Sequence, residues 1–156
     1  MPILRIMLLW GFFLVSPLLS AASSSIVVYA STEDYETTRE NLEFAITGQG
    51  YVVNSVMHIG DMLARTGQDL GYEKIYLQAE SFEFCSAELS YRMMLIDPGN
   101  ITVCPYTVSV YVTSAEPDQV YVAYQKPVLS GEESEHPITE SITAMLDAIA
   151  REAADF

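Results

Sequence analysis

Two cysteines are the residues of this chain whose types and spacing offer the widest choice of chemistry. Cys85 and Cys104 are its only cysteines, and they lack the C-x-x-C spacing of common redox sites. In an oxidising compartment such a pair is typical of a structural disulfide. A redox-active pair is the second interpretation, because Cys85 stands at a predicted helix start, which favours a reactive thiolate. The third is a soft ligand pair for copper(I) or zinc, completed by His58 or a methionine.

The predicted positions of the two cysteines favour the disulfide. Cys85 shares the apolar stripe of a helix predicted over 85–96. Cys104 is held extended by Pro105 and has the strand parity of Tyr106 and Val108. Both sulfurs are therefore expected to point inward. A bridge that closes a loop of about 20 residues would stabilise the fold by roughly 3 kcal/mol.

His58 and Arg65 complete the set of candidate ligand-binding residues, with Cys85 and Cys104. His58 ends a predicted strand, where a histidine is either a hydrogen-bonded structural residue or a ligand. Arg65 follows Asp61 at the spacing of a helix-surface ion pair, and its guanidinium is also suited to bind an anion. The residue pattern identifies no cofactor and no particular metal.

Catalytic motifs give no support to an enzyme. The chain holds no G-x-S-x-G, H-E-x-x-H, P-loop or dinucleotide-binding pattern. Its two histidines, His58 and His136, do not define a Ser/His/Asp triad, and His136 lies in an acidic segment. We therefore expect a non-enzymatic accessory protein that binds a small ligand or a partner. A thiol-redox or metal-binding protein using the two cysteines is the alternative.

The N-terminal segment has the order of a signal peptide. Arg5 precedes an apolar run over 6–15, and Ser20 and Ala22 are small residues suited to cleavage after position 22. The sequence thus predicts a signal peptide over 1–22, a single domain over 23–156, and a periplasmic location. The alternative is an uncleaved N-terminal helix that anchors the protein, with the apolar run extended to Leu19.

The charge of the chain restricts its partners. Its 21 acidic residues against 7 basic ones give a formal net charge of −14. Such a charge repels phosphate backbones and anionic lipid headgroups, so nucleic acid is not an expected partner. A small ligand or an envelope protein is expected instead. Contact with a membrane is expected only through the N-terminal segment before cleavage.

Hydrophobic periodicity predicts the elements that must position these residues. The expected order is β-α-β-α-β-α-β-β-α, an α+β sandwich with a mostly antiparallel sheet and helices on one face. Met62, Leu63 and Leu70 are expected to form the apolar face of the second helix, and Ile75 and Leu77 that of the third strand. The predicted strands cover 26–30, 51–58, 74–84, 101–113 and 120–126, and the predicted helices cover 32–48, 60–70, 85–96 and 137–154.

Several short motifs together resemble the DUF302 family. They are Phe84-Cys85-Ser86-Ala87, Met93-Met94, Asp97-Pro98, Asn100-Ile101, Cys104-Pro105-Tyr106 and Val110-Tyr111, and the upstream run from His58 to Gly67 is similar to the exported, cysteine-containing proteobacterial branch. The resemblance covers about 26–129. It implies a TBP-like α+β fold, here a two-layer sandwich, and no settled biochemical activity. Many family members carry an Asn-Pro turn where this chain has Cys85-Ser86, which places Cys85 where a family pocket is expected.

Overall fold

The computed structural model describes residues 25–131 and 137–155, so the predicted signal peptide lies outside the described residues. Within these ranges the strands and helices follow the predicted order, with one short 3-10 helix added after the third α-helix. The elements are β1 (Ile26–Ser31), α1 (Tyr35–Gly48), β2 (Val53–Met57), α2 (Ile59–Leu70), β3 (Tyr76–Phe84), α3 (Ala87–Ile96), η1 (Pro98–Val103), β4 (Tyr106–Thr113), β5 (Val120–Gln125) and α4 (Pro137–Asp155).

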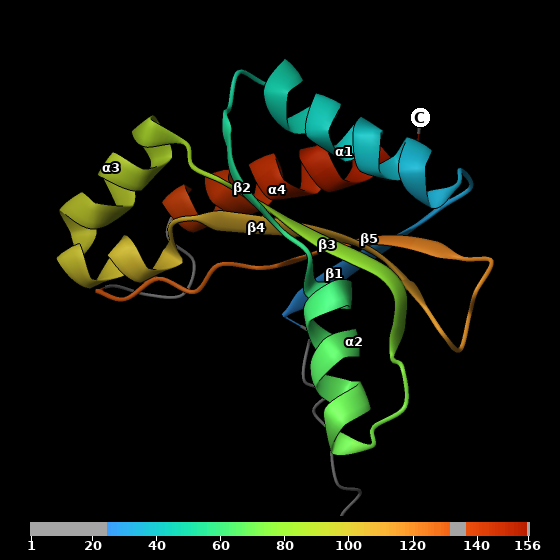
Figure 1. Ribbon diagram of the computed structural model, residues 1–156. Helices are drawn as coiled ribbons and strands as arrows, with labels where there is room; N and C mark the ends of the chain where they lie inside the picture. Colours follow the sequence, from blue (N-terminus) through green and yellow to red (C-terminus); the bar gives the residue numbers. More distant parts are fainter. Residues whose placement is uncertain (1–24, 132–136, 156) are drawn as a thin grey trace, which may run out of the picture.

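The five strands form one sheet in the order β1-β5-β4-β3-β2. Every neighbouring pair in it is antiparallel, which confirms the predicted α+β class. Figure 1 shows α1 and α4 side by side on one face of this sheet. The hydrophobic core fills the space between that helical layer and the sheet.

Much of the core consists of periodic apolar stripes on α1, α4 and β4. Along β4, every second residue is buried, because successive side chains of a strand point to opposite faces. The helical stripes on α1 and α4 face these strand residues at the spacing of one helix side. The predicted stripe residues that are buried are Tyr35, Thr38, Leu42, Ala45 and Ile46 on α1 and Ile138, Ile142, Met145, Leu146 and Ile149 on α4.

The third strand presents the opposite face to the core from the one predicted. Phe82 and Phe84 are fully buried, whereas Ile75 is 61% exposed and Leu77 is also exposed. The rings of Phe82 and Phe84 bury more apolar area than Ile75 and Leu77 would. The side of the strand that carries the two rings therefore faces the core. The pairing of β3 with β4 also shifts register between Tyr76 and Gln78.

The second helix is not packed as predicted. In Figure 1, α2 projects from the β2 side of the sheet, away from α1 and α4. Its apolar residues Met62, Leu63 and Leu70 are exposed, and Gly60 is its buried residue. A Cβ at Gly60 would come within 2.9 Å of the Ala79 nitrogen, so only glycine permits this close approach to β3. No helix of the described ranges is long and apolar enough to cross a membrane.

The segment around the third helix also differs from the prediction. The helix begins at Ala87 with Ser86 as its N-cap, so Cys85 precedes it. Part of the strand predicted over 101–113 is instead the 3-10 helix η1. Asn100 explains this, since its buried side chain donates to the Met93 and Ser130 carbonyls and accepts from the Ser130 N–H.

A carboxylate joins α4 to the edge strands. Asp147 accepts hydrogen bonds from the hydroxyl groups of Tyr29 on β1 and Tyr124 on β5, and it pairs with Arg151 at 3.2 Å. The Arg151 guanidinium also lies over the Tyr29 ring, 5.0 Å from its centroid. The hydrogen bond from Tyr29 is the main cause that holds the pKa of Asp147 below its usual value.

We expect Asp147→Asn to lower the free energy of unfolding by about 1–2 kcal/mol at neutral pH, since hydrogen bonds to a partly exposed charge are lost. The pKa of Asp147 is lowered on folding from 3.8, so its contribution is complete above that pH and is lost as the pH falls below it. Urea unfolding of both proteins from neutral to acidic pH should show the difference shrinking. Glu88→Gln, at an exposed helix pair, is the control, and a constant difference would contradict the assignment.

Candidate functional site

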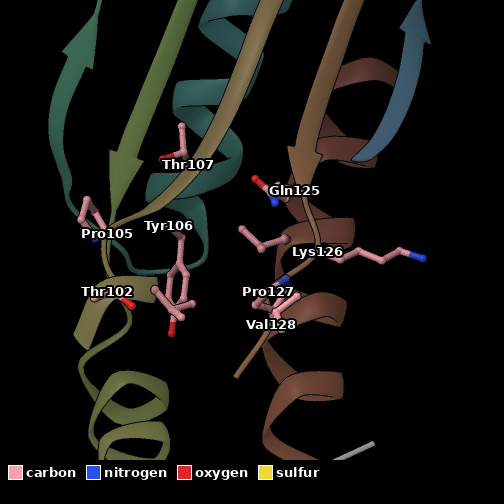
Figure 2. Close-up of a pocket in the computed structure, with 10 residues that line it drawn as sticks. Thr102, Pro105, Tyr106, Thr107, Gln125, Lys126, Pro127 and Val128 are labelled. Atoms are coloured by element: carbon pink, nitrogen blue, oxygen red, sulfur yellow. The ribbon is translucent and has the colours of Figure 1, made fainter. Parts of the chain in front are cut away.

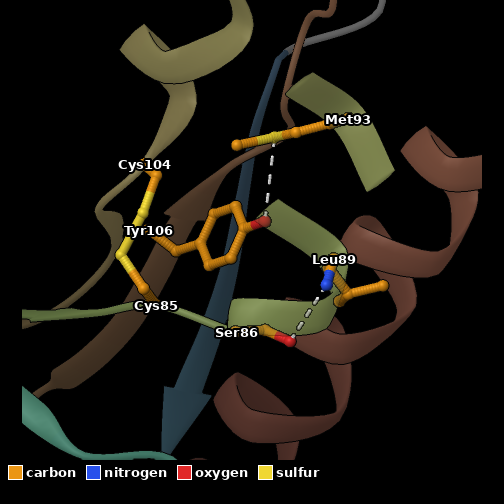
Figure 3. Close-up of a disulfide and its surroundings, with 6 residues drawn as sticks. All are labelled: Cys85, Ser86, Leu89, Met93, Cys104 and Tyr106. Atoms are coloured by element: carbon orange, nitrogen blue, oxygen red, sulfur yellow. Dashed lines mark hydrogen bonds between the residues drawn. A yellow bond between two sulfur atoms is a disulfide. The ribbon is translucent and has the colours of Figure 1, made fainter. Parts of the chain in front are cut away.

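The two cysteines are joined at disulfide distance, as the sequence predicted. Their sulfurs lie 2.09 Å apart and their Cα atoms 6.2 Å apart. Figure 3 shows that the bridge ties the junction of β3 and α3 to the start of β4. Both cysteines are half-buried, and Cys104 packs against the core. The peptide bond between Cys104 and Pro105 is cis.

An aromatic cluster lies beside the disulfide. The Phe84 ring lies 5.7 Å from that of Tyr51 and 6.0 Å from that of Tyr106. The Tyr106 hydroxyl donates to the Met93 sulfur at 3.9 Å, as Figure 3 shows, and burial raises the pKa of this tyrosine. Strand β3 and the disulfide thus hold the first residues of β4 in a defined position.

A pocket of about 320 Å³ opens beside Cys104. The ladder between β4 and β5 ends at the pair of Val108 and Tyr124, and beyond this pair the two strands separate. Figure 2 shows the pocket residues on both sides of that opening. The lining consists of Thr102, Val103, Pro105, Tyr106, Thr107, Gln125, Lys126, Pro127, Val128 and Leu146.

The lining of this pocket is mixed polar and apolar, and Lys126 is its one charged residue. Thr102, Thr107 and Gln125 supply hydroxyl and amide groups, while Leu146 and Val128 are apolar. In Figure 2 the Lys126 side chain extends away from the other labelled residues. None of the lining residues is a carboxylate, although the chain has 21 acidic residues. Such a lining suits an uncharged molecule with one polar end and one apolar end.

His58 belongs to a different cluster. Its Nδ1 lies 2.8 Å from Oε1 of Glu80, whose Oε2 accepts a hydrogen bond from Nε of Arg39 at 2.8 Å. The Arg39 guanidinium lies over the Phe82 ring, and a pocket of about 180 Å³ lies beside His58 and Glu80. This chain of contacts orients the imidazole ring. Burial, followed by the charge of Glu80, raises the pKa of the adjacent Tyr35.

Sequence reasoning missed the role of Glu80. A third strand with Ile75 and Leu77 on its apolar face would place Glu80 on the solvent face, but Glu80 has the parity of Phe82 and Phe84 and pairs with Arg39 on α1. A carboxylate at the parity of two phenylalanines, with an arginine on a preceding helix, is the signal that could have identified this ion pair.

The four candidate ligand-binding residues do not form one site. His58 lies next to Glu80 in the middle of β3, whereas Cys85 follows the end of that strand, roughly 16 Å farther along it. Arg65 is exposed on α2, and among the described residues no ion pair joins it to Asp61. The structure therefore does not bring His58, Arg65 and the two cysteines together at one place. Of the four, only Cys104 borders the pocket of about 320 Å³, through its neighbours Val103 and Pro105.

A metal centre has no ligand set in the described part of the chain. No group of three or more histidine, cysteine, aspartate or glutamate side chains lies close enough to hold an ion there. The bonded cysteines offer no thiolate while the disulfide is intact. The residues that the structure describes therefore give the predicted metal interpretation no support.

A five-stranded antiparallel sheet with helices packed on one face defines the chain as an α+β protein of two layers. The family DUF302, "Domain of unknown function DUF302", matches residues 27–153, so the chain belongs to this family. The crystal structure of an uncharacterized conserved DUF302 protein from Bacillus stearothermophilus has the same fold, with a TM-score of 0.65 and 17% identity over 82% of this chain and 97% of that one. No curated protein matched the chain.

Proposed function

We propose that this protein is an exported, non-enzymatic binding module that takes a small uncharged amphiphilic ligand in the pocket beside Cys104. The observation that carries the proposal is the opening of the sheet between β4 and β5, where hydroxyl, amide and apolar groups converge. A cavity of about 320 Å³ is within the size range of small-molecule sites.

Two further features support this function. The formal charge of −14 disfavours anionic ligands, and the lining has no carboxylate that would select a cation. A disulfide and an aromatic cluster hold one wall of the pocket, which limits the entropy lost when a ligand binds. A disulfide-distance pair is also compatible with export to an oxidising compartment.

Hexanamide, with hexanoate as its anionic counterpart, is a suitable probe for this pocket. In two-dimensional NMR titrations of the purified protein, we expect hexanamide to shift the backbone amides of Thr107, Gln125 and Val128 more strongly than hexanoate does. The amide group matches the polar lining, whereas the carboxylate meets the negative field of the protein. The measurement gives both the site and the dissociation constant.

Val128→Trp and Val52→Trp form a matched pair of variants. Both valines are exposed, by 79% and 72%, but only Val128 lines the pocket. An indole at position 128 should cover the opening and weaken hexanamide binding by about tenfold, a loss of about 1.4 kcal/mol. The Val52 variant should bind as the unmodified protein does. Equal binding by both variants, or shifts scattered over the surface, would reject the pocket as the site.

Thiol-disulfide exchange is the second candidate function. It is favoured by one observation, that the pocket reaches the residues on both sides of Cys104. Thiol titration of the native protein at a series of glutathione ratios tests it. Ready reduction and reoxidation would support a redox role, whereas a bridge that resists reduction until the protein unfolds would leave the disulfide structural.

A further inference from the structure

The sheet has a second face that no described segment covers, apart from α2 at its margin. Side chains on this face alternate with the core-facing ones along each strand, and on β5 Ala123 of this face is itself buried. We call it the open face. It consists of Ile26, Val28, Ala30, Ser55, Met57, Tyr76, Ala79, Ser81, Glu83, Thr107, Ser109, Tyr111, Thr113, Tyr121, Ala123 and Gln125.

The open face carries almost no charge. Among its residues only Glu83 is charged, in a chain with 21 acidic and 7 basic residues, and one further carboxylate, that of Glu116, accepts a hydrogen bond from the Tyr121 hydroxyl at 2.8 Å. Val28 is 46% exposed and Met57 is 44% exposed, at opposite edges of the sheet. Between them, Ser81 and Ser109 bond to each other through their hydroxyl groups at 2.7 Å, so they do not need water as a partner. A weakly charged, flat surface of this kind is typical of a protein contact.

The apolar side of α2 stands at the margin of this face. Met62, Leu63 and Leu70 are exposed on the helix, and Tyr72 and Ile75 are exposed just after it. The helix has 12 residues and is therefore about 18 Å long, whereas stacked sheets lie about 10 Å apart. A second sheet placed on the open face would thus be flanked by α2.

We propose that the open face binds a second copy of this chain, in a two-fold dimer whose axis runs parallel to β4. This strand is the centre of the five, with two strands on each side. Rotation about such an axis places β1 of one copy over β2 of the other. The projecting α2 of each copy then lies beside the β1 edge of its partner, which makes the contact self-complementary.

The rows of side chains fit this operation. The middle row crosses the sheet through Val28, Ala123, Ser109, Ser81 and Met57. The rotation sets the large apolar Val28 against the partner's Met57, and the small Ala123 against the partner's Ser81. Side chains of matched size across the whole row allow two sheets to approach closely.

The next row of side chains also matches the partner's row across the axis. It crosses the sheet through Ala30, Tyr121, Tyr111 and Ala79, and the two tyrosine rings stack with centroids 5.4 Å apart. The rotation sets Tyr121 of one copy against the small Ala79 of the other. A large side chain therefore meets a small one on each side of the axis, while Tyr111 on the central strand meets the partner's Tyr111 at the axis itself.

The available area is sufficient for a stable dimer. Five strands and three rows cover roughly 480 Å², and α2 adds roughly 180 Å². Two copies together would bury roughly 1,300 Å², within the range of about 1,200–2,000 Å² for specific interfaces. Because each chain carries a charge of −14, the interface must use the weakly charged face, and added salt should tighten the dimer.

Sedimentation equilibrium of the purified protein over a dilution series tests the proposal. We expect twice the chain mass of 17.3 kDa, or twice that of the mature chain after cleavage, and monomers on dilution. Val28→Lys and Met57→Glu should each weaken dimerisation by roughly 100-fold, because each buries an unpaired charge. The double variant should regain most of the lost affinity, because the rotation pairs each lysine with a glutamate of the partner.

The control is Val52→Lys, at an exposed valine outside the open face, which should dimerise as the unmodified protein does. Both substituted positions are exposed, so circular dichroism should show folded variants. A monomer at all concentrations would overturn the proposal, whether the face is then covered by another protein or by another segment of this chain. A dimer unaffected by either single substitution would overturn it as well, and a double variant no better than the singles would overturn the two-fold geometry.

Discussion

Phe84→Ala is expected to lower the free energy of unfolding by about 3–5 kcal/mol. The ring is fully buried and contacts the rings of Tyr51 and Tyr106. Its removal leaves a cavity under the disulfide, which the backbone of β3 cannot close because it is paired on both sides. Urea unfolding followed by circular dichroism measures the loss, which is a large part of the 5–15 kcal/mol typical of a domain.

Two variants control this measurement. Tyr91 is an exposed aromatic residue on α3, and Tyr91→Ala should change stability by no more than about 0.5 kcal/mol. Phe84→Leu keeps most of the side-chain volume and should cost less than the alanine variant. If Phe84→Ala proves too unstable to purify, the leucine variant still gives a value. A cost below about 1 kcal/mol for Phe84→Ala would show that the aromatic cluster does not support the fold as described.

Removal of the disulfide by the double variant Cys85→Ala/Cys104→Ala is expected to cost about 3 kcal/mol. The two cysteines are 19 positions apart, and the bridge restricts the unfolded chain more than the folded one. Because the two side chains are only half-buried, the cavity left behind adds little, and the folded structure should persist. Thermal and urea unfolding, with and without reductant, measure the effect.

Reductant provides the internal control for this second prediction. The unmodified protein should lose the same stability when reduced, whereas the double variant should not respond. The opposite outcome has two parts: reductant leaves the stability of the unmodified protein unchanged, and its native state already has two titratable thiols. Together these results would show that the sulfurs are not bonded in solution. In that case the thiol function would become the better interpretation of the pair.

The largest part of the fold was predictable because it follows from periodicity. Apolar residues at helical spacing on α1 and α4, and at alternate positions on β4, have one energetically favourable side to bury. The disulfide-distance pair was predictable for a related reason, since two cysteines leave a single intramolecular pairing. Composition also determined the strong negative charge, and with it the classes of partner that are disfavoured.

Local patterns were misleading where two apolar sets competed. In β3, hydrophobic residues occur at both odd and even positions. Phe82 and Phe84 face the core because it has room for their rings under α1. On α2 the apolar spacing is real, but no described element covers it, so a pattern that predicted burial in the core instead marks an exposed surface. In both cases the deciding partner is distant in the sequence.

What the sequence by itself determined, then, is the class of fold, the order of its elements and the pairing of Cys85 with Cys104. Only the tertiary structure decided that His58 and the cysteines belong to separate sites, and that a pocket opens beside Cys104 where β4 and β5 part. The physical reason is that a helix or strand is specified by neighbours a few residues away. A pocket depends instead on where the strand pairing between distant segments ends, and the local spacing of residues does not predict where that pairing ends.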